Sequence, residues 1–348
     1  RALEEQREAV AAIGANAACA RFFHLVGLLV VPASHARDLV SSPRAAFIGA
    51  AATVLWCSFG LRFDIALPTL FFLEICAVLI LFLLRWSFIL GLFADPEAKR
   101  PLLIWMGLFA ALYTLSYCYL MPPASGDYLP IVTAGNNDIF NYINCTRFLQ
   151  FLGPSNLADY AFRTPFGGSG VGAYDQTPAV FYGLSALSVF FDGEPIRAAM
   201  PAIFGAVGLF GCATAALVRR GFELPKSICV ALAAVVISGP FFRFNISHYF
   251  LAQGQGMAVV LFVLAETAHI LRHRSTQQIL PILFRFLSFY VVLCFIYPVL
   301  SIIGVGLQSG FVLLYCLLKT EVFCTESIVK TVRVTASWAT GLVCALAI

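Results

Sequence analysis

Residues 67–84 read LPTLFFLEICAVLILFLL, and this stretch decides the class of fold. Glu74 is its only charged side chain. A helix that crosses a bilayer needs about 20 mostly apolar residues, and the stretch comes close to that length. We therefore predict a membrane-spanning helix at Leu67–Leu84, with an acidic side chain in its interior.

The composition of the whole chain indicates the same class. Of the 348 residues, 60% are hydrophobic and 11% are charged, whereas a soluble domain has about 45–50% apolar and about 25% charged residues. The mean hydropathy is +0.88. These proportions exclude a soluble enzyme, a disordered chain and a nucleic-acid-binding protein, because so few charges cannot cover a water-soluble surface. The sequence predicts an all-α fold, a polytopic bundle of transmembrane helices.

About 10 to 11 hydrophobic segments have the character of membrane helices. Pro178–Phe191 is short for a full crossing, so we expect it to be re-entrant or to lie in the membrane interface. The predicted segments are Phe22–Ala33 (extended upstream to Val10), Ala45–Leu61, Leu67–Leu84, Pro101–Met121, Pro178–Phe191, Ala198–Val218, Lys226–Phe242, Tyr249–Leu271, Ile279–Tyr297, Val299–Leu318 and Thr331–Ile348.

The connections between these segments differ in basic charge. If Pro101–Met121 ends outside, the inside connections carry ten Lys and Arg and the outside connections carry four. Cytoplasmic loops are enriched in Lys and Arg, so the long loop 122–177 is predicted to be external. This assignment requires that Pro178–Phe191 does not cross. The inside connections are 95–100, 219–226, 271–278 and 319–333.

The ends and the cysteines carry less information. The chain begins at Arg1 rather than Met and stops inside an apolar run that starts near Val334. We expect it to be part of a longer protein, truncated at the C-terminus. The 11 cysteines contain no CxxC pair, so we interpret them as small buried hydrophobic residues rather than as zinc ligands or a disulfide framework.

Loop 122–177 is the one long polar stretch of the chain. It combines acidic and aromatic residues, a mixture typical of the membrane–water interface. Loops of this length are usually functional. We predict a short interfacial helix at Asp138–Leu152 that Gly153 and Pro154 end. The acidic residues of the loop are Asp127, Asp138, Asp159 and Asp175.

Two motifs in this loop resemble those of the membrane-embedded GT-C glycosyltransferases. The stretch NDIFNY at 137–142, followed by TRFL at 146–149, resembles their acidic motif and interfacial helix, and is similar to the oligosaccharyltransferase catalytic subunit and to protein mannosyltransferase-like families. The stretch DQTPAVFY at 175–182 resembles their loop-closing proline segment. The resemblance extends over about 135–275. It divides the chain into residues 1–100, transmembrane helices without a counterpart, and residues 101–348, a GT-C-like module.

The resemblance implies a membrane glycosyltransferase with a GT-C-like fold. Such an enzyme transfers a sugar from a polyprenyl-phosphate donor, bound from the membrane lipid, to a glycan, lipid or protein acceptor, and inverts the anomeric centre. It implies Asp138 as the catalytic base, and a bacterial inner (plasma) membrane with the loop on the periplasmic side. Some relatives depend on a divalent cation, Mg²⁺ or Mn²⁺, for which Asp138 and Asp159 are the expected ligands. The alternatives are that Asp138 caps the helix after it and that Asp159 is a solvated loop residue.

Cations and amides at the external ends are candidates for substrate binding. Arginine binds phosphate through its planar fork, although an Arg among aromatic residues is also typical of a side chain that snorkels to the interface. Asp175 precedes a Pro and is equally suited to capping a helix. The predicted substrate-binding residues are Asn137, Arg147, Asp175, Arg243, His248, Tyr249 and Gln253.

Two acids lie within predicted helices. A carboxylate inside a membrane segment is a functional candidate by default, so Glu74 is either functional or paired within the bundle. Glu266 lies near an inside end, where we expect it to snorkel. Arg85 is expected to mark the cytoplasmic end of its helix.

Two other functions remain open. A transporter or flippase is the first, although such proteins usually show internal repeats and we find none that is convincing. The second is a non-catalytic assembly subunit with the same fold. It remains open because the acidic motif has one carboxylate, with Asn137 preceding Asp138.

Overall fold

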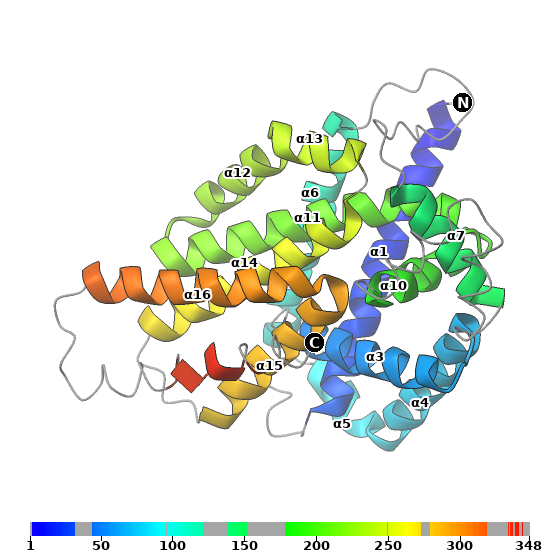
Figure 1. Ribbon diagram of the computed structural model, residues 1–348, viewed down its shortest axis with the longest axis horizontal. Helices are drawn as coiled ribbons and strands as arrows, with labels where there is room; N and C mark the ends of the chain where they lie inside the picture. The colour runs from blue at the N-terminus through cyan, green and yellow to red at the C-terminus, as the bar shows by residue number, and fades with distance from the viewer. Residues whose placement is uncertain are drawn as a thin grey trace.

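The computed structural model describes residues 2–31, 44–94, 96–120, 138–151, 178–248, 250–272, 279–318 and parts of 333–343. Every regular element in these residues is a helix (Figure 1). The elements are α1 (Ala2–Val30), α3 (Arg44–Arg62), α4 (Leu67–Leu84), α5 (Trp86–Ala94), α6 (Pro96–Leu120), α7 (Asp138–Phe151), α10 (Pro178–Ser188), η2 (Val189–Phe191), α11 (Pro195–Phe222), α12 (Lys226–Ile237), α13 (Pro240–Ser247), α14 (Leu251–Arg272), α15 (Ile279–Ile296) and α16 (Pro298–Leu318).

The predicted all-α fold is confirmed for the described residues. Five of their helices are long and apolar enough to cross a membrane, and a sixth crossing results if α12 and α13 form one bent span. Four further apolar helices are shorter, and α10 with η2 is one of them. These features are compatible with an integral membrane protein.

Most predicted helices match the observed ones closely, but two regions differ. The segment predicted at Lys226–Phe242 is not one straight helix, because the chain bends by 54° between α12 and α13. Pro240 opens α13, and Gly239 before it is extended. Proline removes a backbone donor and disfavours a helical residue before it, which explains the break. Helix α5, which follows Arg85, was not predicted.

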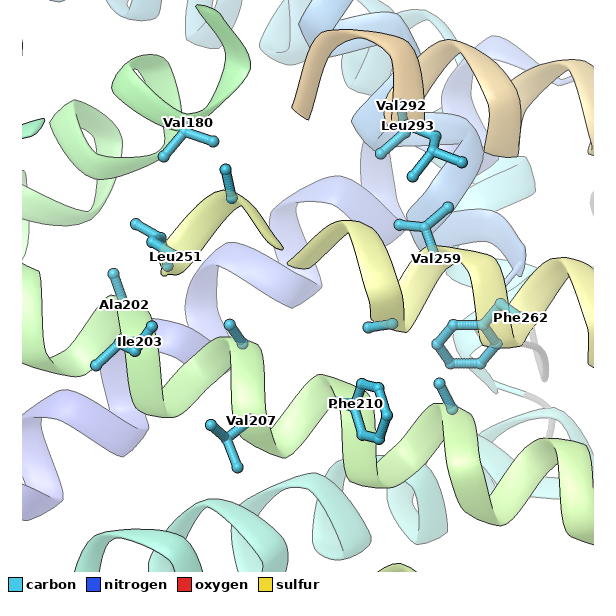
Figure 2. Close-up of a cluster of buried hydrophobic side chains, with 14 of the residues drawn as sticks. Val180, Ala202, Ile203, Val207, Phe210, Leu251, Val259, Phe262, Val292 and Leu293 are labelled. Carbon is cyan, nitrogen blue, oxygen red and sulfur yellow. The ribbon is translucent and has the colours of Figure 1, made fainter. Parts of the chain in front are cut away.

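The core of the bundle is the contact between α11 and α14. Both helices bury apolar side chains in the same core, among them Val207 and Phe210 on α11 and Val259 and Phe262 on α14 (Figure 2). The two helices run parallel, since Ala206 in the middle of α11 lies by Gly254 near the start of α14, and Arg220 near the end of α11 meets Glu266 near the end of α14. They can be parallel because the bent segment of α12 and α13 returns the chain between them.

This arrangement gives the bundle two ends, which we name by what they carry. The loop end is where α6 finishes, α11 and α14 begin, and α7 and α10 lie. The basic end is where α11 and α14 finish and α3 begins. Helix α3 runs antiparallel to α14, because its Arg44 reaches Glu266 and its Phe47 stacks on Phe262.

Glycines allow α1 and α3 to approach each other closely. A Cβ atom on Gly27 would overlap the carbonyl of Ala45, and one on Gly49 would overlap the carbonyl of Phe23. Backbone contact of this kind is typical of helix pairs with small residues at the crossing. The pair is antiparallel, so α1 ends at the basic end.

Arg85 fixes the end of α1. Its guanidinium donates to the backbone carbonyls of Leu28, Leu29 and Val31, with the shortest of these hydrogen bonds 2.6 Å long. The last carbonyls of a helix have no partner within the helix and carry its negative dipole end. Arg85 therefore caps α1 at the basic end of the bundle.

Candidate functional site

Helices α7 and α10 form a parallel pair at the loop end. Tyr142 stacks on Phe181 near the starts of the two helices, with ring centroids 5.5 Å apart. Near their ends, Gln150 donates to the hydroxyls of Ser185 and Ser188. The first residues of the two helices, Asp138 and Pro178, therefore lie at the same end of this pair, although they are far apart in the sequence.

Several predicted site residues fall outside the described part of the chain. They are Asn137, Asp159, Asp175 and Tyr249. For Asp138 the structure describes the backbone, which opens α7 as predicted. Its side chain, and with it the choice between helix cap and catalytic base, remains a prediction.

Arg147 is directed away from the start of α7. It lies nine residues after Asp138, which is about 13 Å along the helix. Its guanidinium pairs with the Glu194 carboxylate at 3.1 Å, and both side chains are exposed. Arg147 therefore already has an anionic partner, at the end of α7 where Gln150 bonds to the Gly193 carbonyl.

Arg243 and His248 lie on the exposed side of α13. The His248 ring stacks on Phe244 and Phe250, and its Nδ1 lies 3.0 Å from the Phe244 carbonyl oxygen. Arg243 is exposed beside Phe241 and Phe244. Helix α13 packs against α6, α11 and α14, whereas α7 packs against α4, α10 and α11. These two residues therefore present cationic and aromatic groups on another side of α11 from α7.

Gln253 lies in the first turn of α14. Its amide is 3.5 Å from the Tyr297 hydroxyl, in the break between α15 and α16. Helix α10 also packs against α15, and Val180, in the first turn of α10, belongs to the same core as Leu251 (Figure 2). Gln253 is therefore the described candidate on α14, whose first residue, Leu251, shares a core with Val180 of α10.

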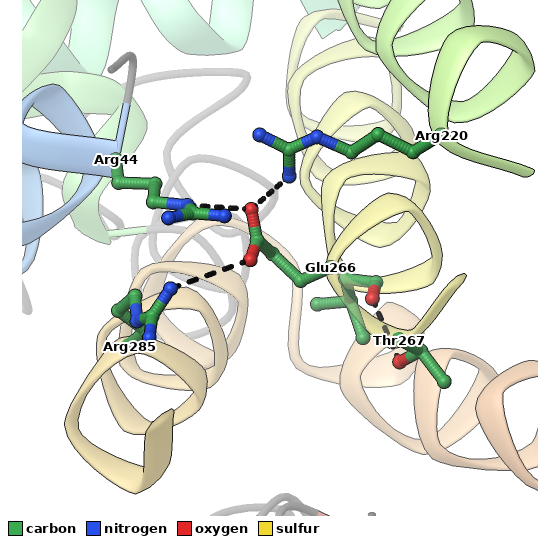
Figure 3. Close-up of polar contacts among 6 residues, drawn as sticks. Arg44, Arg220, Glu266, Thr267 and Arg285 are labelled. Atoms are coloured by element: carbon green, nitrogen blue, oxygen red, sulfur yellow. Dashed lines mark hydrogen bonds and ion pairs between the residues drawn. The ribbon is translucent and has the colours of Figure 1, made fainter. Parts of the chain in front are cut away.

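The expectation that Glu266 snorkels is wrong. Glu266 is 2% exposed, and its carboxylate contacts three guanidinium groups from three other helices (Figure 3). Arg44 of α3 binds Oε1 at 2.8 Å, Arg220 of α11 binds the same oxygen, and Arg285 of α15 approaches Oε2 at 3.7 Å. One carboxylate thus joins α3, α11, α14 and α15 at the basic end.

A neutral hydrogen-bond network continues from this cluster. Thr267, the next residue of α14, accepts a hydrogen bond from the Gln308 amide at 3.1 Å. The Tyr290 hydroxyl donates to Gln308 at 2.8 Å. The network connects α14, α15 and α16, so both polar clusters at this end serve to join helices.

Glu74 is paired within the bundle, one of the two alternatives that the sequence left open. Its carboxylate accepts hydrogen bonds from the Thr53 hydroxyl on α3 and from the Tyr182 hydroxyl on α10. Glu74 is 4% exposed, and its partners are buried too. Sequence reasoning missed both partners, because a Thr and a Tyr in apolar helices carry no signal of their own.

No metal site is formed by the described residues. They contain no group of three or more His, Cys, Asp or Glu that could hold an ion. Both expected ligands of a divalent cation, Asp138 and Asp159, lack described side chains.

Comparison with known proteins gives no relative. No family model, no curated protein and no solved structure matches the chain. The proposed function therefore depends on the motif resemblance and on the geometry of the described residues.

Proposed function

We propose that the protein is an integral membrane glycosyltransferase that acts at the loop end of the bundle. It would take a sugar from a polyprenyl-phosphate donor and transfer it to an acceptor hydroxyl. The single observation that carries the proposal is the parallel pairing of α7 and α10. This pairing brings Asp138 of the acidic motif to the same end as Pro178 of the proline segment.

In the proposed reaction Asp138 is the general base. It takes the proton of the acceptor hydroxyl, the acceptor oxygen forms a bond to the anomeric carbon, and the bond from that carbon to the phosphate oxygen breaks. Polyprenyl phosphate leaves with the bonding electrons, and the anomeric centre inverts. A positioned base typically contributes a factor of about 10²–10⁴ in rate.

Other residues have supporting roles in the proposal. Arg243 and His248 were predicted to hold the phosphate, but α13 packs on another side of α11 from α7. The proposal therefore gives them contact with lipid headgroups rather than with the reacting phosphate, because exposed aromatic side chains lie beside them. Gln253, Asn137, Asp175 and Tyr249 would bind the sugar. Arg147 has no phosphate-binding role in the proposal, since its guanidinium already pairs with the Glu194 carboxylate. A divalent cation, if used, would take Asp138 and Asp159 as ligands and supply positive charge beside the phosphate.

The proposed location is the inner membrane of a bacterium with the loop end outside. Supporting this orientation, Arg44, Arg85, Arg220 and Arg285 all gather at the basic end. Basic residues are enriched on the cytoplasmic side.

Replacing the base tests the proposal. The full chain in lipid vesicles is incubated with radiolabelled polyprenyl-phosphate hexoses, and the release of polyprenyl phosphate is measured. We expect Asp138→Asn to lower kcat by about 100-fold or more and to leave donor binding intact. The matched control is Asp192→Asn, on an exposed residue that pairs with Arg197, which should keep full turnover. Retained turnover in Asp138→Asn, or no transfer from any hexose donor, would refute the proposal.

A transporter or flippase is the second candidate, and the bend between α12 and α13 is the observation in its favour. Transporters often build their substrate sites from broken helices. A transporter would move a lipid-linked sugar between leaflets of the same vesicles without releasing polyprenyl phosphate, and it would tolerate Asp138→Asn.

A further inference from the structure

Glu74 is a carboxyl group that the proposed function does not use. It lies seven residues into α4, about 10 Å from the start of that helix. Among the described residues its hydrogen-bond partners are Thr53 and Tyr182, and no cationic side chain pairs with it. An ionised carboxylate is costly in an apolar interior unless a cation faces it.

The chemistry of the two partners sets Glu74 apart from Glu266. A guanidinium only donates hydrogen bonds, so the three arginines around Glu266 require an ionised carboxylate. A hydroxyl can either donate or accept. Thr53 and Tyr182 can therefore satisfy an ionised Glu74, to which both donate, and also a neutral Glu74, whose own O–H is accepted by one of them.

Few other titratable groups surround Glu74. The described groups that interact with it electrostatically are Cys57 on α3 and Tyr182 on α10. Both are neutral in their ordinary state. On its own helix, Arg85 lies eleven residues away, about 16 Å along the axis, and is occupied by the end of α1. No described charge near Glu74 fixes its proton state.

Further polar groups lie on α10 after the tyrosine that binds Glu74. Ser185 and Ser188 follow Tyr182 at a spacing of three residues, which places successive members of the series near one another on the helix surface. Gln150 of α7 bonds to both serines and to the carbonyl of Gly193. Gly193 is exposed and precedes Glu194. A chain of hydrogen bonds thus runs from Ser185, one turn after Tyr182, to the exposed Gly193.

We propose that Glu74 is a proton-binding site, and that its proton controls how firmly α10 docks on α3 and α4. With the proton bound, the neutral carboxyl and its two hydroxyl partners hold α10 in place. When the proton leaves, a negative charge without a cation appears between the three helices, and the docking of α10 weakens. The proposal does not depend on the transfer of sugar.

Labelling with the hydrophobic reagent dicyclohexylcarbodiimide tests the site. A protonated carboxyl adds to this reagent, and the adduct rearranges to a stable N-acylurea without losing any atom. Leu73, beside Glu74, is 40% exposed on the outer side of α4, so a lipid-soluble reagent can approach. We expect mass spectrometry of the full chain, labelled in lipid vesicles, to find the adduct on Glu74. The labelled fraction of Glu74 should fall as the pH rises. Glu266 is the matched control within the same chain and should stay unlabelled.

Infrared difference spectra make the test independent of reagent access. On raising the pH, the wild-type chain should lose the C=O band of a protonated carboxyl, and Glu74→Gln should lack this change. Tyr182→Phe should shift the band, because one hydrogen bond is removed. The proposal is overturned if no such band belongs to Glu74, or if Glu266 is labelled as readily as Glu74.

Hydrogen exchange tests the docking of α10. The protection of α10 amides, which is their exchange rate relative to the intrinsic rate at each pH, should fall as the pH rises in the wild-type chain. It should stay constant in Glu74→Gln, whose side chain keeps its size and stays neutral. Equal pH dependence in the two chains would refute the control of docking, even if Glu74 binds a proton.

Discussion

Two glutamates are buried in the described helices, and they differ in the groups that surround them. Glu266 lies at the basic end and is surrounded by three arginines from three helices (Figure 3). Glu74 lies between α3, α4 and α10 and is surrounded by hydroxyl groups. Both are almost inaccessible to solvent.

The difference shows that partners, rather than burial, decide what a buried carboxyl can do. Glu266 is fixed as an anion because guanidiniums only donate, so its role is to join helices. Glu74 can hold or release a proton while its partners adapt. Helix α3 contributes to both sites, with Arg44 at its start and Thr53 in its middle. Changes at α3 and at each glutamate therefore test the comparison.

The largest effect is expected from Glu266→Gln. The substitution keeps the size of the side chain but leaves three guanidiniums without their shared anion. Removing one partner from a buried ion pair typically costs about 3–5 kcal/mol. Thermal unfolding in detergent, followed with a dye that reacts with newly exposed cysteines, would measure the loss. The double variant with Arg220→Gln should recover part of it, and a single variant as stable as the wild-type chain would contradict the assignment.

The next largest effect is expected at the crossing of α1 and α3. Gly49→Ala places a Cβ atom against the Phe23 carbonyl and should push α3 away from α1, which weakens both glutamate sites. Overpacking of this kind costs about 1–3 kcal/mol. Gly14→Ala on α1 is the control, because its Cβ meets no atom within 4 Å. That variant should be neutral or more stable, since alanine favours a helix over glycine.

A smaller loss is expected when Glu74 loses one hydroxyl. Tyr182→Phe removes a hydrogen bond from the carboxyl and should lower the free energy of unfolding by about 1 kcal/mol. Tyr113→Phe is the matched control, because the buried Tyr113 hydroxyl has no hydrogen-bond partner among the described residues. Equal losses in the two variants would mean that the Glu74–Tyr182 bond adds nothing to stability.

The smallest effect is expected at the exposed pair of Arg147 and Glu194. Glu194→Gln should change stability by less than about 0.5 kcal/mol, because exposed ion pairs are screened by water and salt. The same unfolding measurement applies. A loss as large as that of Glu266→Gln would mean that this pair is shielded from solvent.

The sequence predicted most of the fold because apolar length is a local property. Leu67–Leu84 matches α4 residue for residue, and the predicted interfacial helix at Asp138–Leu152 differs from α7 by one residue. The break before Pro240 was missed, although the proline was visible, because hydropathy continues through it. For the candidate site, Asp138 and Gln253 were predicted as site residues from the sequence. How far apart they lie in the fold could not be predicted from it.

What the sequence determined alone is that this chain is a bundle of apolar helices, with most of the Lys and Arg of its connections on one predicted side. Which polar side chains meet was decided by the tertiary structure. Arg44, Arg220 and Arg285 are far apart along the chain, and only the packing of α3, α11 and α15 around α14 brings them to Glu266. In the same way, the docking of α10 gives Glu74 its tyrosine. The physical reason is that hydrophobicity acts on each segment separately, whereas a hydrogen bond or ion pair requires two atoms within about 3 Å of each other.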